Sequence, residues 1–253
     1  MQKLYSNDIT QYIHDNIEVF YIKRLKILRS LTLNYILEHK NPYSYLFRTK
    51  HILSVETFVR EALDDYLYPQ EETIFGDFLE GLAIFVCSKT FNGKKVNKVG
   101  IDLEFDRDNT RYIVEIKSGP HWGNSSQIKK MIDNFNRTKQ ELKKTEPDLN
   151  VIAVNGCCYG RDNRPYKQKH GYYKYCGQQF WSLISDEDEL YTQIIKPLGH
   201  QAKKRNDDFE EAYYQLINKF SFEFGKEFCI DGRIDWPTLV KFSSSFQTQN
   251  QKQ

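Results

Sequence analysis

Two acidic residues and a lysine occupy positions from which they could act together on a phosphate ester. Asp102 lies in the short apolar segment 99–105, and Glu115 and Lys117 lie two residues apart around the end of the next apolar segment, 112–116. The polar run between the segments predicts the loop of a β-hairpin. Residues two apart on a strand project from the same face, and pairing across the loop brings Asp102 roughly opposite Glu115. The spacing therefore predicts two carboxylates and one ammonium group at one edge of a small sheet.

Such a cluster is unfavourable unless something compensates the like charges, because carboxylates resist desolvation beside one another. A divalent metal would compensate them. Mg²⁺ prefers a few carboxylate oxygens and fills its other positions with water and phosphate. A lysine beside the metal could orient or help deprotonate a water and stabilise charge on a pentavalent phosphate. The cluster thus indicates metal-dependent hydrolysis of a phosphodiester.

Asp102, twelve intervening residues and then Glu115-Ile116-Lys117 resemble the PD-(D/E)XK core of many type II restriction endonucleases. The surrounding runs EETIFGDFLEGLAIF, EIKSGPHWGNSSQ, NGCCYG and CGQQFW resemble one subgroup of these enzymes, the one typified by PmeII. The resemblance covers most of the chain after about Lys40. Ile101 replaces the proline that gives the motif its first letter, a common departure in the superfamily.

This resemblance implies an α/β fold, a restriction-endonuclease-like core in which helices flank a mixed central β-sheet, with an N-terminal helical region. It also implies that Asp102 and Glu115 bind Mg²⁺, for which Mn²⁺ can substitute, with help from the Ile116 carbonyl. Lys117 would position the attacking water. In-line attack on phosphorus would leave a 5′-phosphate and a 3′-hydroxyl. Glu80, in an amphipathic helix predicted over 71–86, would bind a second metal or the metal-bound water.

The acid that the helix before the hairpin contributes to the site has two candidates, and a structural role is a further alternative. Asp77 is an alternative to Glu80 for the third acid, and a lone glutamate at the border of an apolar helix face is most often solvent-facing.

A turn-rich loop, 118–126, follows the hairpin and leads into a helix predicted over 126–144. The N-terminus of that helix would face the metal site and could hold a phosphate. Gln127 would touch the catalytic lysine or the scissile phosphate, as related enzymes place a glutamine here, or it is simply a capping residue. His121 could be a general base, although DNA contact is favoured. The predicted DNA contacts of this region are His121, Trp122, Asn124, Ser125 and Lys129.

The segment 156–176 combines basic and aromatic residues, as DNA-binding loops do. Lysine and arginine bind phosphates or guanine edges, and tyrosine can stack on bases. An exposed basic loop without a ligand is the alternative. The predicted DNA contacts here are Tyr159, Arg161, Arg164, Lys167, Lys169, His170 and Tyr172.

The same segment contains four possible zinc ligands, Cys157, Cys158, His170 and Cys176. Adjacent cysteines lack the Cys-x₂-Cys spacing that grips one zinc ion. Structural zinc is therefore disfavoured, and buried free thiols are expected.

Composition limits the class of protein. Of 253 residues, 40% are hydrophobic and 28% charged, which argues against disorder, and the net charge of +2 does not by itself indicate a nucleic-acid partner. Five cysteines without a regular framework indicate a reducing compartment. No apolar run approaches about 18 residues and no signal-like segment is recognised, so we expect a cytoplasmic protein without a membrane partner.

Four regions are expected along the chain: an N-terminal helical region over 1–70 packed on the core, the nuclease core over 71–200, a C-terminal helical extension over 201–242 and a frayed tail over 243–253. Within them we expect a helix pair over 8–40 whose basic residues serve DNA contact or dimerisation, or are simply solvated. We also expect helices over 54–67, 187–198 and 206–220, a buried strand over 149–155 and a strand over 180–184.

The favoured hypothesis is a type II restriction endonuclease that cleaves both strands of a short double-stranded DNA site. A palindromic site would imply a homodimer, and a cognate DNA methyltransferase would be a functional partner. One alternative is a repair, recombination or modification-dependent nuclease. Another, weaker because Asp102, Glu115 and Lys117 are all present, is a non-catalytic DNA-binding protein on the same fold.

Overall fold

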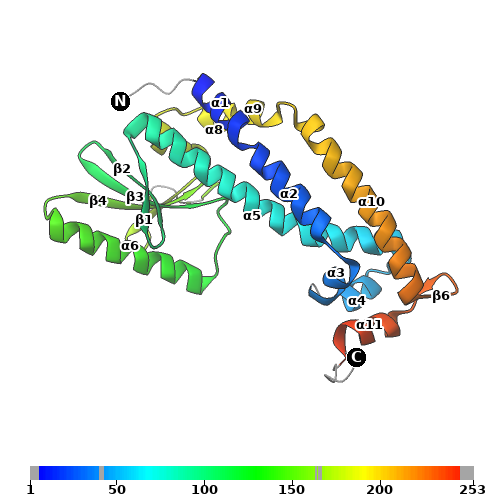
Figure 1. Ribbon diagram of the computed structural model, residues 1–253. Coiled ribbons are helices and arrows are strands. Elements are labelled where there is room, and N and C mark those ends of the chain that lie inside the picture. Colours follow the sequence, from blue (N-terminus) through cyan, green and yellow to red (C-terminus); the bar gives the residue numbers. More distant parts are fainter. Residues whose placement is uncertain (1–5, 40–42, 163, 165–166, 246–253) are drawn as a thin grey trace. The chain divides into compact units, whose positions relative to one another are not determined.

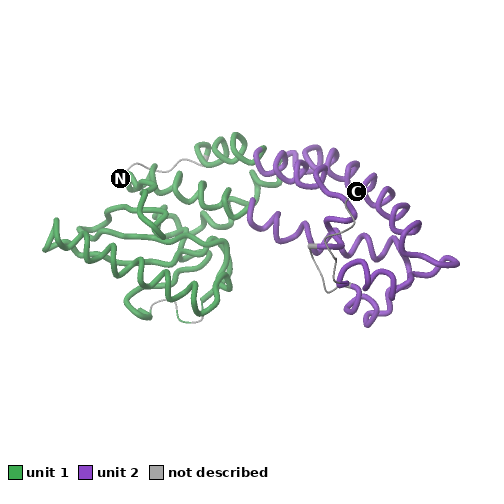
Figure 2. Tube along the Cα trace, turned by 60° about the horizontal axis from the view of Figure 1, so that its bottom comes forward, with its two compact units in different colours: residues 1–18, 75–200 green, residues 19–74, 201–253 purple. Residues whose placement is uncertain are grey.

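The computed structural model describes residues 6–39, 43–162, 164 and 167–245. It divides into two compact units (Figure 2). Residues 1–18 and 75–200 form the sheet unit, and residues 19–74 and 201–253 form the helical unit. Residues 19–70 and 201–242, which belong to two regions predicted as separate, thus contribute together to one unit, whereas residues 1–18 belong to the sheet unit. No helix in the described ranges is long and apolar enough to cross a membrane.

The sheet unit is built on five strands in the order β1-β2-β3-β4-β5 (Figure 1). The strands are β1 (Lys94–Lys98), β2 (Ile101–Arg107), β3 (Thr110–Lys117), β4 (Asn150–Cys157) and β5 (Tyr172–Cys176). The first three pair antiparallel, whereas β4 pairs parallel with both β3 and β5. This mixed sheet flanked by helices confirms the predicted fold class.

The predicted hairpin is confirmed, with longer strands and a tighter turn. β2 and β3 are joined by Asp108 and Asn109, both with positive φ (50° and 55°), as a two-residue type I′ turn requires. Arg111 holds the strands together beside the turn by donating to both carboxylate oxygens of Asp106, at 2.8 and 2.9 Å. Residues expected in the loop, such as Arg107, are therefore strand residues.

Helices cover both faces of the sheet (Figure 1). On one face, α6 (Ser125–Thr145) buries a stripe of residues at helical spacing, including Met131 and Phe135, against Ile113 and Ala153. On the other, the C-terminal part of α5 (Val55–Phe91) and α7 (Gln178–Ser185) pack on the sheet. The remaining helices of this unit are α1 (Ser6–Asn16), α8 (Leu190–Gln193) and α9 (Ile195–Gly199).

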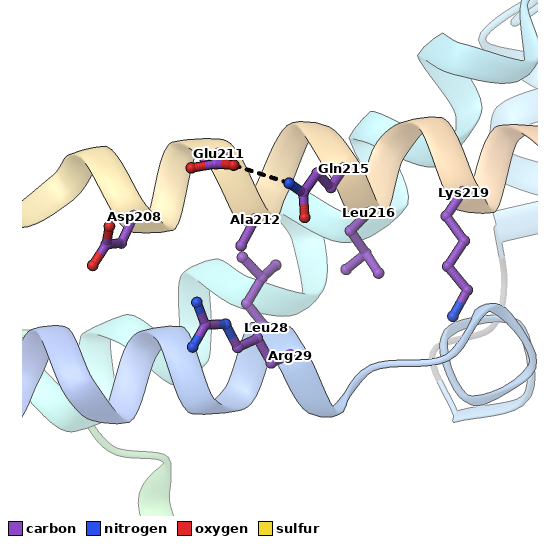
Figure 3. Close-up of a pocket in the computed structure, with 8 residues that line it drawn as sticks. All are labelled: Leu28, Arg29, Asp208, Glu211, Ala212, Gln215, Leu216 and Lys219. Atoms are coloured by element: carbon purple, nitrogen blue, oxygen red, sulfur yellow. Dashed lines mark hydrogen bonds between the residues drawn. The ribbon is translucent and has the colours of Figure 1, made fainter.

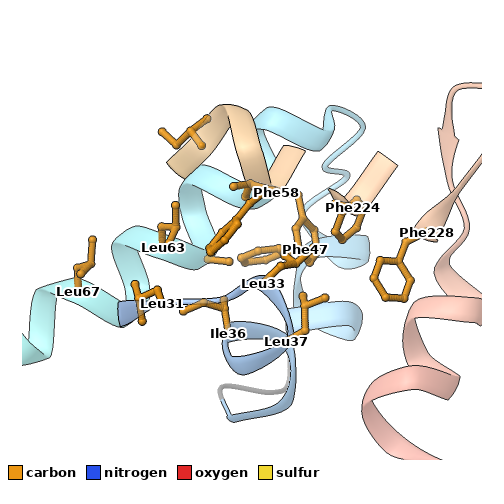
Figure 4. Packing of buried hydrophobic residues seen from close by; sticks show 14 of the residues in the cluster. Leu31, Leu33, Ile36, Leu37, Phe47, Phe58, Leu63, Leu67, Phe224 and Phe228 are labelled. Carbon is orange, nitrogen blue, oxygen red and sulfur yellow. The ribbon is translucent and has the colours of Figure 1, made fainter. Parts of the chain in front are cut away.

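The helical unit has its own core, in which phenylalanine rings pack among leucine and isoleucine side chains (Figure 4). Phe47, Phe58 and Phe224 are almost fully buried, and the ring of Phe58 contacts the other two. Its elements are α2 (Glu18–Ser30), α3 (Leu33–His39), α4 (Tyr43–Thr49), the N-terminal part of α5, α10 (Ala202–Phe228), β6 (Cys229–Ile230), β7 (Arg233–Ile234) and α11 (Trp236–Ser244).

Arg24, which sequence analysis groups with a DNA-contacting or dimerising basic arm, serves this helical unit internally. Its guanidinium pairs with Glu71 and Asn206 and lies 3.4 Å from the ring centroid of Phe209.

Several predicted elements are wrong. The helices predicted over 54–67 and 71–86 are one 37-residue helix, α5, which continues through Pro69. Buried Leu67 and Ile74 flank the proline, so packing offsets the hydrogen bond that proline removes. The helix predicted over 187–198 is two short ones, α8 and α9.

The strand predicted over 180–184 is the helix α7, because a short apolar run does not distinguish strand from helix. Phe180, Trp181 and Ile184 are buried at helical spacing. The expected DNA-binding loop over 156–176 is also shorter, since β4 extends to Cys157 and β5 begins at Tyr172.

Gly156→Ala tests the packing of α7 on the sheet. A Cβ at residue 156 would lie 2.3–3.0 Å from ring atoms of Phe180, which is fully buried. We expect overpacking to lower the free energy of unfolding by about 1–3 kcal/mol, measured by denaturant titration. Gly199→Ala is the control, because its Cβ would meet nothing within 4 Å. Equal stability of the two variants would contradict the packing described here.

Candidate active site

Asp102 lies where β2 separates from β3. The paired residues of the two strands run from Arg107 opposite Thr110 to Leu103 opposite Val114. Asp102 comes just before this paired stretch of β2, and its side chain accepts a hydrogen bond from the N–H of Ile116 at 2.7 Å. The carboxylate thus replaces a strand partner for that N–H group. Burial raises the pKa of Asp102, and the negative charges of Glu80 and Glu115 raise it further, against the opposing effects of the Ile116 N–H and of Lys117.

Glu115 and Lys117 lie side by side on β3, as the two-residue spacing predicts. Lys117 Nζ lies 2.8 Å from Glu115 Oε1. Glu115 is only 8% exposed, and its second oxygen, Oε2, is buried without a hydrogen-bond partner among the described residues. Leaving a carboxylate oxygen buried and unpaired is costly. A cation or donor at Oε2 would remove that cost.

Glu80 joins this cluster from α5. Its charge acts on Asp102, and its Oε1 lies 2.9 Å from Nζ of Lys95 on β1. Close packing brings α5 to the sheet here, since a Cβ on Gly76 would lie 2.5 Å from Oγ of Ser118. Asp77, the alternative acid, is exposed, and its charge acts on Lys95.

Glu80, Asp102 and Glu115 form an acidic cluster with the residue types of a divalent-cation site. No group of three or more His, Cys, Asp or Glu side chains in the described part of the chain is, however, already arranged to hold an ion. Instead, each of two lysines pairs with one acid: Lys95 with Glu80 and Lys117 with Glu115. Three carboxylates against two lysine ammonium groups leave an excess of negative charge, and Glu115 Oε2 has no hydrogen-bond partner among the described residues. A hard cation with oxygen ligands fits that excess.

The loop after β3 leads into α6 through a complete capping box. Asn124 Oδ1 accepts from the Gln127 N–H at 3.0 Å, and Gln127 Oε1 accepts from the Asn124 N–H at 2.9 Å. Gln127 therefore has the capping geometry that sequence analysis weighed against contact with the lysine. His121, Ser125 and Lys129 are exposed around this helix start.

Trp122, from the same loop, faces the cluster. Its ring centroid lies 4.9 Å from Lys117 Nζ, and its indole N–H donates to Asn155 Oδ1 at 3.1 Å. Sequence analysis missed Asn155 and Lys95. An asparagine that ends the apolar run LNVIAVN is the one signal that could have drawn attention to Asn155.

Most residues predicted to contact DNA after β4 are exposed, and one is not. Tyr159 is 51% exposed and lies against Gly119, while Lys169 is partly exposed, 3.5 Å from Asp162. Arg161, Arg164, Lys167 and His170 are exposed as well. Tyr172, by contrast, is 7% exposed, belongs to β5 and packs against Phe135, so its ring is part of the core.

The cysteines of this region are free and buried, as expected. Cys157 and Cys176 lie opposite each other on β4 and β5, and Cys158 follows β4. Burial raises the pKa of Cys158, which therefore stays a thiol at neutral pH.

A separate cavity of about 310 Å³ lies in the helical unit, between α2 and α10, and the side chains around it are drawn in Figure 3. It is lined by Leu28, Arg29, Asp208, Glu211, Ala212, Gln215, Leu216 and Lys219. A hydrogen bond from Gln215 to Glu211 crosses one turn of α10. None of the predicted site residues lines this cavity, so the open end of the β2–β3 hairpin is the better candidate for an active site.

Comparison with known proteins points to one family. The family model described as Type II restriction endonuclease EcoO109I matches residues 7–206, a span that includes every residue of the acidic cluster. A search of the curated proteins found no match to the chain.

The raised pKa of Asp102 predicts a pH-dependent gain in stability for Asp102→Asn. Because the folded state favours the protonated acid, ionised Asp102 destabilises the fold at neutral pH, and this effect disappears as the pH falls below the ordinary range of the group. Asparagine keeps an oxygen for the Ile116 N–H. We therefore expect Asp102→Asn to have a higher free energy of unfolding than the unmodified chain at pH 7 in EDTA. The difference between the two should shrink as the pH falls toward 4.

Asp106→Asn is the matched control with the opposite sign. Arg111 lowers the pKa of Asp106, so its ionised form stabilises the fold at pH 7. This variant should lose stability at pH 7, only slightly because Asp106 is largely exposed. A loss of stability in Asp102→Asn at pH 7 would contradict the description of the cluster.

Proposed function

We propose a specific activity for this chain, which belongs to the type II restriction endonuclease EcoO109I family: Mg²⁺-dependent hydrolysis of both strands of a short double-stranded DNA site, leaving 5′-phosphate ends. Membership makes the chain a restriction endonuclease and DNA its substrate. We add three points that family membership alone does not give. They are dependence on a divalent metal, the assignment of the site as PD-(D/E)XK, and the PmeII-like subgroup.

One observation carries the proposal. Lys117 pairs with Glu115 at 2.8 Å, while the second oxygen of Glu115 lies buried and unpaired near Asp102. This arrangement supports a PD-(D/E)XK site, in which two acids bind a cation and the lysine acts on water and phosphate. The raised pKa of Asp102, caused mainly by burial, and the unpaired oxygen of Glu115 favour function over structure, because a merely structural cluster would gain stability by pairing every oxygen among the described residues.

Asp102 and Glu115 would hold the divalent cation, together with the Ile116 carbonyl. When bound, such a cation supplies a Lewis acid and lowers the pKa of a water. Mn²⁺ is expected to substitute for Mg²⁺. Glu80 is proposed to bind a second cation or one of its waters.

Lys117 orients the attacking water and places positive charge at the scissile phosphate. The attacking water gives up a proton to solvent, and its oxygen bonds to phosphorus in line as the bond to the 3′ oxygen breaks. The 3′ oxygen then takes a proton from solvent, which leaves a 3′-hydroxyl and a 5′-phosphate.

DNA would be held by the exposed basic and aromatic residues around this edge. Tyr159, Arg161 and Lys167 after β4, and Lys129 on the first turns of α6, are exposed. Lysine and arginine in such positions neutralise phosphates. We propose that two chains act as a homodimer on a palindromic site, in the cytoplasm, and that a DNA methyltransferase of the same system protects host sites.

Lys117→Met should abolish cleavage while sequence-specific binding remains. Losing a positioned acid–base or charge-stabilising group typically costs at least about 10²-fold in rate. The measurement is digestion of a sequenced plasmid with Mg²⁺, with the fragment ends mapped, alongside a mobility-shift assay. Discrete fragments from the unmodified chain also separate a restriction enzyme from a structure-specific repair nuclease.

Lys219→Met is the control for that experiment, because Lys219 also pairs with a glutamate, Glu223, but on α10. It should cleave at the unmodified rate. Full activity of Lys117→Met would remove the lysine from the proposed mechanism.

Mg²⁺ should stabilise the unmodified chain against unfolding without DNA. A ligand at 100 times its dissociation constant adds about 2.7 kcal/mol to the free energy of unfolding, measured as a shift in Tm on titration. Glu115→Gln should abolish that shift, because it removes the charge of the buried carboxylate. The same Tm shift in Glu115→Gln would mean that Mg²⁺ binds elsewhere.

A further inference from the structure

We propose that Trp122 and Asn155 form a clamp that positions Lys117 for catalysis, an inference that rests on the proposed nuclease function. Trp122 was predicted to contact DNA, and Asn155 was not among the predicted site residues. Their contacts in the structure point inward, to the acidic cluster.

Asn155 is the fixed part of the clamp. It is 1% exposed and lies on β4 directly opposite Glu115 of β3. A buried amide is tolerated when its donor and acceptor are both used. Here Oδ1 accepts from Trp122 Nε1 at 3.1 Å, and Nδ2 donates to the Glu115 carbonyl at 3.3 Å. An indole N–H can only donate, so it must face the amide oxygen, which turns the amide nitrogen to Glu115.

Trp122 carries the positioning from Asn155 to the lysine. Its partly buried ring packs against the apolar cluster formed by the sheet and α6, which includes Met131 and Phe135. The hydrogen bond to Asn155 fixes the rotation of the ring. The Lys117 ammonium lies over the ring, 4.9 Å from its centroid, a geometry in which the aromatic face attracts a cation.

Lys117 needs such support because a lysine side chain is a flexible four-carbon stem that loses entropy when it is held in place. Glu115 also pairs with it, but Glu115 is a proposed cation ligand. The ring of Trp122 is not, so its contact with Lys117 can persist while the carboxylate is engaged elsewhere. The clamp therefore holds the ammonium at the site independently of the acids.

Kinetics distinguish this clamp from a DNA contact. Trp122→Leu removes the ring, whereas Trp122→Phe keeps an aromatic face and loses only the N–H to Asn155. At saturating DNA, we expect the single-turnover cleavage rate to fall about 10-fold or more in Trp122→Leu, and less in Trp122→Phe. DNA dissociation constants, measured without divalent metal, should stay within about 3-fold. Trp236→Phe, at a tryptophan that lies beneath Arg48 in the helical unit, should match the unmodified rate.

The proposal is overturned if Trp122→Leu cleaves at the unmodified rate, or if it loses binding while its rate at saturation is unchanged. The second result would assign Trp122 to DNA contact. A lower cleavage rate at saturation with an unchanged DNA dissociation constant, and with Trp122→Phe in the intermediate position, supports positioning.

Fluorescence tests the clamp without any cleavage. Lys117→Met should change the tryptophan emission of the metal-free protein, because it removes a charge from the face of Trp122. The same substitution in a Trp122→Phe background should leave emission unchanged. A change that persists in that background overturns the proposed geometry. If Lys117→Met changes the emission as expected but the unmodified chain cuts no DNA with Mg²⁺, the proposed function is disproved and the contact between Lys117 and Trp122 stands.

Discussion

The incomplete pairing of Glu115 is the constraint on which the rest of the site depends. A carboxylate that is 8% exposed with one oxygen unpaired is unfavourable by itself. It persists because β3 is held on both sides, by β2 in the hairpin and by β4 across a parallel ladder that runs the full length of the strand. The scaffold therefore fixes the acid in place, and a charged ligand can relieve the cost.

The two ends of the hairpin place the same residue types in opposite electrostatic environments. Near the turn, Arg111 donates to Asp106 and to Glu146, and the pKa of Asp106 is lowered. At the far end, burial raises the pKa of Asp102, and the neighbouring charges of Glu80 and Glu115 raise it further. Paired charge stabilises the hairpin, whereas the excess of acid at its open end must be tolerated by the fold. Such a contrast within one hairpin is characteristic of a functional site.

Local pattern was sufficient for the parts of the fold that short-range rules govern. Two short apolar segments around a polar run predicted the hairpin, and the turn-rich loop with N-cap residues at its end predicted a helix from about residue 126, close to where α6 begins. Those rules also predicted that Glu115 and Lys117 share a face. They failed where tertiary packing decides, as at Pro69 inside α5 and in the apolar run of α7, whose side chains are compatible with strand or helix.

Partners that are distant in sequence could not be predicted for a related reason. The pairing of Asn155 with Glu115 depends on the register of a parallel ladder, which a long crossover connection does not specify. Lys95 reaches Glu80 because α5 approaches the sheet at a glycine, Gly76. Neither the register nor the approach leaves a periodic signal in the sequence, so both residues were missed although the acids beside them were found.

Residue type proved a weak guide to which side chains face a ligand, and the aromatic residues show why. Tyr159 and Tyr172 both lie in a basic, tyrosine-rich stretch, yet one is half exposed after β4 and the other is buried in β5. Trp122 is intermediate, with its N–H bound to Asn155 and its face turned to Lys117. An aromatic ring beside Lys117 can contact DNA or position the lysine, and the hydrogen bond from its N–H to buried Asn155 favours positioning of the lysine.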